Sequence, residues 1–174
     1  MAAYFLDSSA LVKRYVQEVG TSWVRGLARR GAANQIILAR ITAVEVTSAI
    51  ARRRQGGSLT SARASLFLSR FRRHLAGRYV LLDMTPSLLA EAMNLANIHE
   101  LRAYDAVQPA SALRVNRLSG GAIVLVSSDQ ELNKAAAAEG LTVVVHGTIL
   151  RERHMRMVRP PGFAAALTTP RLSR

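Results

Sequence analysis

The sequence predicts an α/β protein with a parallel sheet covered by helices on both faces. Five short apolar segments rich in Val, Ile and Leu are typical of buried strands. They are residues 3–6, 36–39, 79–82, 123–126 and 142–145. Segments with helical spacing separate them, and regular alternation of strands and helices is typical of parallel sheets.

The first strand is predicted to end at Asp7. Ser8 or Ser9 then follows as a candidate N-cap, because a serine hydroxyl accepts from a free backbone N–H at a helix start. Val12, Val16 and Val19 are predicted to form the inward face of this helix. In open α/β sheets, ligands bind beyond the carboxyl ends of the strands, so Asp7 lies where a site is expected.

The next two helices are bounded by recognisable cap residues. Gly20 is predicted to end the first helix, and Thr21 to cap a second that runs to Arg30. After the second strand, Thr42 is predicted to begin a third helix, which carries Glu45 near its start.

Three further helices precede the fourth strand, and a last helix is predicted after Asp129, through Ala138 to Gly140. An amphipathic helix is predicted over residues 58–76, and Pro86 opens the next, since proline is tolerated in the first helical turn. A helix over 102–117 contains Asp105. Pro109 lies four residues after Asp105 and removes the helical hydrogen bond to its carbonyl, so a kink is expected there.

The chain has 174 residues, which suits one domain with a proper core. We expect the domain to cover residues 1–149. Residues 150–174 are expected to form a basic, proline-containing C-terminal tail, with a short docking segment at 163–167.

A formal net charge of +13 and a pI near 11.6 favour a polyanionic partner. Lys13 and Lys134 are the only lysines, so arginine supplies nearly all of the positive charge. Guanidinium groups bind phosphate through two parallel hydrogen bonds and stack on bases, which points to nucleic acid. The alternative is a compositional bias that leaves a solvated basic surface.

Several function classes are excluded or disfavoured. Cysteine is absent, which excludes disulfides, thiolate catalysis and cysteine zinc sites. No apolar run approaches membrane-span length and no secretory signal is recognisable, so a cytoplasmic protein without a membrane partner is expected. The histidines lack metal-ligand spacing, Ser8 and Ser9 lack a nearby base, and no phosphate-binding loop is present.

Four acidic residues occupy positions from which they can converge. Asp7 and Asp129 each end an apolar strand next to small hydroxyl residues, and meet if the two strands are adjacent. Glu45 and Asp105 each lie near the beginning of a helix. Clustered carboxylates repel one another unless a cation neutralises them, and oxygen ligands suit Mg²⁺ or Mn²⁺.

These motifs resemble a known family. The stretches 6–13 (Leu-Asp-Ser-Ser-Ala-Leu-Val-Lys), 42–45 (Thr-Ala-Val-Glu), 101–106 (Leu-Arg-Ala-Tyr-Asp-Ala) and 126–129 (Val-Ser-Ser-Asp) resemble the PIN domain. The resemblance is strongest to the VapC toxin type of bacterial toxin–antitoxin pairs, and it covers roughly residues 3–146.

The resemblance implies a PIN-like three-layer α/β/α sandwich with a central, mostly parallel five-stranded sheet. It implies Mg²⁺- or Mn²⁺-dependent cleavage of RNA, homodimerisation, and neutralisation by a cognate antitoxin. Residue by residue, the acidic quartet of the family matches Asp7, Glu45, Asp105 and Asp129. These are therefore the expected catalytic and metal-binding residues.

Other residues are expected to support this chemistry. Ser9 and Ser127 match the hydroxyl positions of the family and are expected to orient the carboxylates or waters of the site. Glu131 is an alternative ligand, although the first turn of a helix is an ordinary place for an acid. The candidate RNA contacts are Lys13, Arg52, Arg53 and Arg102.

Two other functions remain open at this stage. One is a non-catalytic basic module on the same fold that binds RNA or docks a partner, although such a module gains nothing from clustered acids. The other is a receiver-like phosphoacceptor domain. That class needs an acid pair after the first strand and a lysine after the last, and Val145-His146-Gly147 does not supply the lysine.

Overall fold

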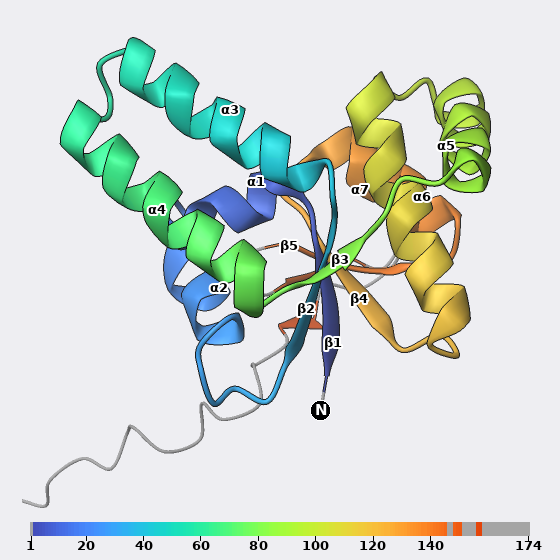
Figure 1. Ribbon diagram of the computed structural model, residues 1–174. Helices are drawn as coiled ribbons and strands as arrows, with labels where there is room; N and C mark the ends of the chain where they lie inside the picture. Colours follow the sequence, from blue (N-terminus) through green and yellow to red (C-terminus); the bar gives the residue numbers. More distant parts are fainter. Residues whose placement is uncertain (1, 146–147, 151–155, 158–174) are drawn as a thin grey trace, which may run out of the picture.

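The computed structural model describes residues 2–145, 148–150 and 156–157, which form one sheet with helices on both sides (Figure 1). The strands are β1 (Ala3–Leu6), β2 (Gln35–Ala39), β3 (Val80–Leu82), β4 (Ile123–Val126), β5 (Thr142–Val145), β6 (Thr148–Leu150) and β7 (Arg156–Met157). The helices are α1 (Ser8–Leu11), the 3₁₀ turn η1 (Val12–Arg14), α2 (Thr21–Leu27), α3 (Thr42–Gln55), α4 (Ser61–Gly77), α5 (Pro86–His99), α6 (Ala103–Leu118) and α7 (Gln130–Ala138). Among the described residues, no helix has both the length and the apolar character that a bilayer crossing requires.

The strand order is β3-β2-β1-β4-β5-β6-β7, and the first five strands in this order are parallel. The predicted five-stranded parallel sheet is therefore confirmed. The sheet continues into β6 and β7, which pair antiparallel and were not predicted. Most of the predicted tail, including the candidate docking segment at 163–167, lies outside the described residues.

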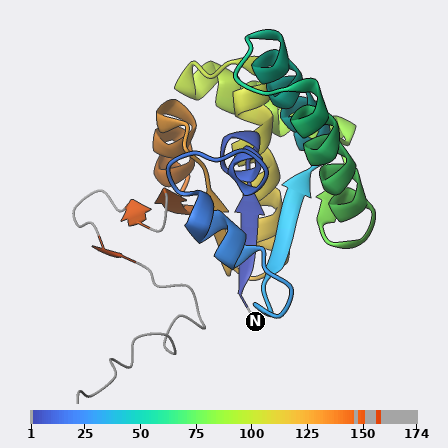
Figure 2. The same ribbon diagram turned by 90° about the vertical axis from the view of Figure 1, so that its left-hand side faces the viewer.

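Two apolar layers flank the sheet because side chains alternate along each strand. On β1, Tyr4 and Leu6 face the core formed with α1, α2, α3 and α4, whereas Phe5 faces the core formed with α6 and α7. Helix α5 packs on α6 through Leu88 and Leu95. Figures 1 and 2 show α1 to α4 on one side of the sheet and α5 to α7 on the other, which is the predicted α/β/α arrangement.

The first helix differs from its prediction. Asp7, rather than Ser8 or Ser9, is its N-cap, because the Asp7 carboxylate accepts from the Ala10 N–H. The α-helix ends at Leu11 and tightens into η1, so the helical spacing does not reach Val19. Val19 is 77% exposed, and its predicted inward position is wrong.

Gly20 also has a different role from the predicted one. With φ of 88° it is the N-cap of α2, and not the residue that ends the first helix. This left-handed backbone conformation is accessible to glycine without the penalty that a Cβ atom imposes. The predicted end of this helix at Arg30 is also too late, since α2 ends at Leu27.

Candidate active site

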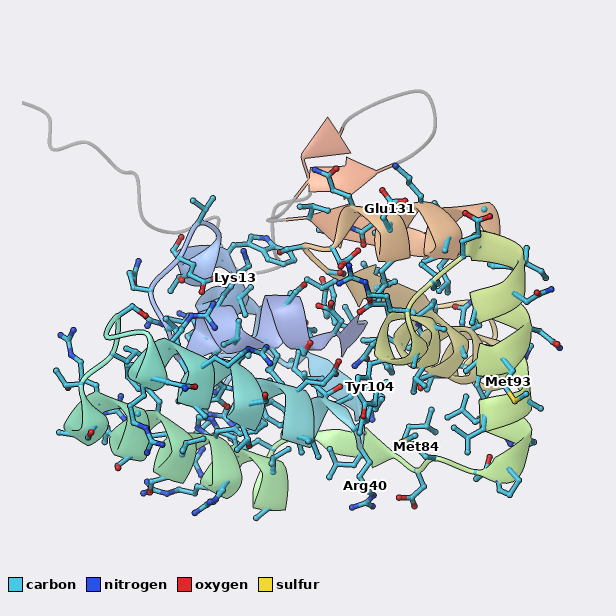
Figure 3. All side chains as sticks on the ribbon, turned by 90° about the horizontal axis from the view of Figure 1, so that it is seen from above. Lys13, Arg40, Met84, Met93, Tyr104 and Glu131 are labelled. Atoms are coloured by element: carbon cyan, nitrogen blue, oxygen red, sulfur yellow. The ribbon has the colours of Figure 1, made fainter. Side chains whose placement is uncertain are left out.

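The carboxyl ends of β1 and β4 bring the first two predicted acids to one place. The strands are parallel neighbours with Leu6 beside Val126, and the Asp7 N–H donates to the Val126 carbonyl oxygen at 3.1 Å. The residues that follow the two strands therefore lie side by side. Figure 3 looks onto this edge of the sheet, which α1, α3, α6 and α7 surround.

Asp7 is held in a fixed position by hydrogen bonds. Its carboxylate accepts from the Ala10 N–H at 2.8 Å, the Ser9 hydroxyl at 2.9 Å and the Ser127 hydroxyl at 3.0 Å. The residue is only 3% exposed. Burial raises the pKa of Asp7 to about 6, although these hydrogen bonds lower it. The fold therefore places a carboxylate where ionisation is costly.

Ser9 and Ser127 connect Asp7 to the loop that carries Asp129. The Ser127 hydroxyl accepts from the Asp129 N–H at 3.0 Å, and the Ser9 hydroxyl accepts from the Ser128 N–H at 2.8 Å. The Asp129 carboxylate accepts from the Leu132 N–H at 2.9 Å and so caps α7. Both serines thus lie between the two acidic loops.

Glu45 reaches the same region from the first turn of α3. Its carboxylate accepts from the Gln108 amide at 2.5 Å, and the Gln108 amide also donates to the Thr42 hydroxyl at 2.9 Å. Burial, together with the charges of Asp7 and Asp105 and against the hydrogen bond from Gln108, raises the pKa of Glu45 to about 7. Glu45 is thus electrostatically coupled to two of the other acids.

Asp105 completes the set from the first turn of α6. Burial and then the charge of Asp129 raise the pKa of Asp105, whereas Arg102 lowers it. Helix α6 continues through Pro109, so that proline does not remove Asp105 from the helix. The four predicted acids therefore come from four different segments and repel one another at one edge of the sheet.

Gln108 was not identified from the sequence. It is 1% exposed and links α3 to α6 through Thr42 and Glu45. A helical spacing of three residues places Asp105 and Gln108 on one face of α6, and the same spacing relates Thr42 to Glu45 on α3. This spacing could have indicated from the sequence that Gln108 lies on the same helix face as Asp105. It does not show that this face of α6 meets α3.

Gln108→Ala is expected to lower the free energy of unfolding by about 1–3 kcal/mol, because Glu45 and Thr42 lose a buried donor. It is also expected to raise the pKa of Glu45 further, since the amide favours the ionised form. Denaturant unfolding measures the first effect, and NMR titration of the Glu45 carboxyl carbon measures the second. Gln55→Ala, at the exposed end of α3, is the control. Equal stability of the two variants would contradict this role.

The candidate RNA contacts have different environments. Lys13 is 6% exposed, and its ammonium donates to the Val19 carbonyl oxygen at 3.0 Å. Arg53 forms an ion pair with Glu18. Arg52 and Arg102 are exposed. Only these last two arginines present largely accessible side chains.

Glu131, the alternative ligand, is also exposed. Its carboxylate accepts from the Lys134 ammonium at 2.8 Å on the outer surface of α7. Figure 3 shows Glu131 on this helix. This environment is that of an ordinary first-turn acid on a helix.

The donor set fits a hard divalent cation. In the described residues, no three acidic or histidine side chains are already arranged as a coordination site. Mg²⁺ often binds through one or two carboxylates and keeps several waters, so it does not need three protein ligands. The raised pKa values of Asp7 and Glu45 show that negative charge here is costly, and a cation would offset that cost. The residues present therefore fit Mg²⁺ or Mn²⁺.

Comparisons with known proteins identify the family. The chain is similar to PAE2754 from Pyrobaculum aerophilum, with 25% identity, a TM-score of 0.56, and 82% of this chain and 90% of that chain covered. It is similar in fold to FitAB bound to an IR36 DNA fragment (16% identity, TM-score 0.59, 87% and 99% covered). It is also similar in fold to VapBC2 from Rickettsia felis bound to a promoter DNA fragment (15% identity, TM-score 0.57, 82% and 98% covered). No curated protein matches the sequence. The family model of the PIN domain matches residues 4–138, which include all four acids, and the chain therefore belongs to the PIN domain family.

Proposed function

We propose that this protein is a metal-dependent endoribonuclease that hydrolyses phosphodiester bonds of single-stranded or structured RNA. PIN domains are generally nucleases. The proposal is supported most strongly by the proximity of the four acids: the charges of Asp7 and Asp105 raise the pKa of Glu45, and the charge of Asp129 raises that of Asp105. A protein with a net charge of +13 that only bound polyanions would gain nothing from this negative cluster.

In this proposal, Asp7, Glu45, Asp105 and Asp129 hold one or two Mg²⁺ or Mn²⁺ ions, directly or through water. When bound, such an ion polarises a phosphoryl oxygen and lowers the pKa of a coordinated water. Asp7 offers its carboxylate in one orientation, because Ala10, Ser9 and Ser127 all donate to it. Gln108 gives Glu45 a similar restraint.

The RNA backbone is held by arginine side chains around the carboxylates. Arg52 lies on α3, the helix that carries Glu45, and Arg102 is the N-cap of α6, the helix that carries Asp105. Both arginines are exposed. Contacts from arginine to phosphate position the strand but carry no base sequence information. RNA affinity is therefore expected to fall steeply as salt concentration rises.

We further propose that the protein is the toxin of a toxin–antitoxin pair. Solved structures of similar fold are FitAB and VapBC2 complexes. A cognate antitoxin would inhibit cleavage by inserting a basic side chain among the carboxylates. Homodimerisation is supported by the exposed apolar residues Met93 and Ile98 on α5. Figure 3 shows Met93 on this helix.

The decisive experiment is cleavage of end-labelled single-stranded RNA by the purified chain. Shorter products are expected with Mg²⁺ or Mn²⁺, and none with a chelator in excess. A DNA oligonucleotide of the same sequence tests the substrate class. If RNA is bound but stays intact with both metals, the protein is the non-catalytic RNA-binding module that the sequence left open.

A further inference from the structure

Two adjoining cavities lie away from the carboxylates, on the side of the sheet that α2 and α4 cover (Figure 1). The first, of about 250 Å³, is lined by Arg14, Tyr15, Arg25, Phe67, Arg70 and His74. The second, of about 550 Å³, is lined by Arg30, Arg73, His74, Gly77 and Arg78. His74 lines both cavities, so they adjoin, and we call the pair the arginine cavity. No carboxylate lines it.

The guanidinium groups of the arginine cavity have no carboxylate partner among the described residues. In the described part of the chain, none of its arginines forms an ion pair with a carboxylate, whereas Arg40, Arg53, Arg114 and Arg117 elsewhere do. The acceptors used inside the cavity are neutral. Arg14 donates to the Tyr79 hydroxyl at 2.6 Å, and Arg25 donates to the Arg14 carbonyl oxygen at 3.1 Å. Six like charges gathered in this way repel one another, and an anionic ligand would relieve that repulsion.

Aromatic side chains form the floor of the arginine cavity. The Tyr15 hydroxyl is hydrogen-bonded to His74 Nδ1 and to the Tyr79 hydroxyl, each at 2.8 Å. Tyr15 also contacts the buried Phe71 ring edge-on, with centroids 5.4 Å apart. Burial and then the nearby Arg14 lower the pKa of His74 to about 4, so the imidazole is neutral at physiological pH. The floor is thus fixed in place, and the positive charge comes from arginine alone.

We propose that the arginine cavity is a second RNA-binding site, which holds successive phosphodiester groups of single-stranded RNA at a distance from the cleavage centre. The inference rests on the proposed function in taking RNA as the ligand, but it requires no cleavage. Arginines line both adjoining cavities, and each guanidinium group can bind a phosphate through paired hydrogen bonds, so a strand with several phosphates can use more than one of them. Phe67 and His74 are partly exposed and offer rings that a base can contact, as in other single-strand sites. An acidic peptide would use the charges but not the rings.

The test compares two double variants of α4 that remove the same charge. Arg70→Gln/Arg73→Gln changes two exposed residues that line the cavity, and Arg63→Gln/Arg72→Gln changes two exposed residues of the same helix that do not. The binding of a labelled single-stranded oligouridylate is measured by fluorescence anisotropy in excess chelator, over a range of salt concentrations. All of these positions are exposed, so both variants are expected to fold, which circular dichroism checks.

The cavity variant is expected to bind RNA about tenfold more weakly at 0.1 M salt. Its slope of log affinity against log salt should fall by about 1.4, since each lost phosphate contact on a single strand accounts for about 0.7. The control variant should change affinity less than about twofold. The inference would be overturned if the cavity variant and the control variant lost the same amount of RNA affinity. It would also be overturned if a polyglutamate peptide displaced RNA equally well from both variants. Because binding is measured without cleavage, this outcome is independent of whether the protein proves to be a nuclease.

Discussion

Asp7→Asn is expected to reduce RNA cleavage by at least about 100-fold. Asp7 is the most deeply buried acid of the site, and its orientation is fixed by donors from Ala10, Ser9 and Ser127. Asparagine has the same size but lacks the negative charge that attracts a divalent cation. The loss of a few kcal/mol of transition-state stabilisation corresponds to this change in rate. The initial rate of cleavage of labelled RNA at saturating Mg²⁺ or Mn²⁺ measures it.

The same substitution is expected to stabilise the protein when no metal is present. An ordinary Asp pKa of 3.8 that burial raises to about 6 corresponds to about 3 kcal/mol of lost stability above pH 7. Asparagine avoids this cost and still accepts from the Ala10 N–H, since it is a good N-cap residue. Urea unfolding at pH 7.5 in chelator should therefore show a higher free energy of unfolding for Asp7→Asn.

Asp83→Asn is the matched control, because it makes the same chemical change at an exposed acid paired with Arg40. It should leave both cleavage and stability nearly unchanged. If Asp7→Asn proved less stable than the native chain, its loss of activity would be explained by misfolding. A cleavage rate within a few-fold of the native rate would remove Asp7 from the chemistry.

The second large effect expected is a loss of metal-free stability as pH rises. The pKa values of Asp7 and Glu45 are raised to about 6 and about 7, above their values in an unfolded chain. A raised pKa means that the native state binds more protons than the unfolded state between the two values. The contribution of these groups is therefore fully present below about pH 4 and is lost as pH rises through 6 and 7.

The expected loss between pH 5 and pH 8 is about 2–3 kcal/mol. Asp7 supplies about 1.4 kcal/mol of it, because part of its loss already occurs below pH 5, and the partly solvated Glu45 supplies the rest. Thermal unfolding in chelator across this range measures it. The double variant Asp7→Asn/Glu45→Gln should have a much flatter profile. A ligand at 100 times its Kd adds about 2.7 kcal/mol to the native state, so Mg²⁺ or Mn²⁺ should restore most of the loss in the native chain only. Parallel profiles for the native chain and the double variant would contradict the assignment.

The sheet was predictable because the signals for it are local. Buried strands such as 123–126 are short apolar runs, and their carboxyl ends fix where Asp7 and Asp129 meet. The placement of Glu45 and Asp105 followed from the family resemblance, and the structure brings both toward the other acids. Their roles in metal binding and catalysis remain predictions.

What the sequence did not reveal depends on contacts between distant segments. Gln108 donates to Glu45 only because α3 and α6 meet, and no periodicity on either helix encodes that meeting. Arg53 was a candidate RNA contact, but Glu18 from the segment after η1 pairs with it. Helix α1 ends early because the backbone tightens into η1. The apolar residues keep a helical spacing as far as Val19, so the sequence pattern did not reveal this end, and Val19 is exposed.

The central position of β1 has a consequence for the order in which the protein becomes active during synthesis. Asp7 is synthesised well before its neighbour in the sheet, β4, and before the Ser127 hydroxyl that donates to it. A nascent chain that ends before Ile123 carries Asp7, Glu45 and Asp105 without the strand that aligns them with Asp129. Under the proposed ribonuclease function, such an unfinished chain is expected to leave RNA intact.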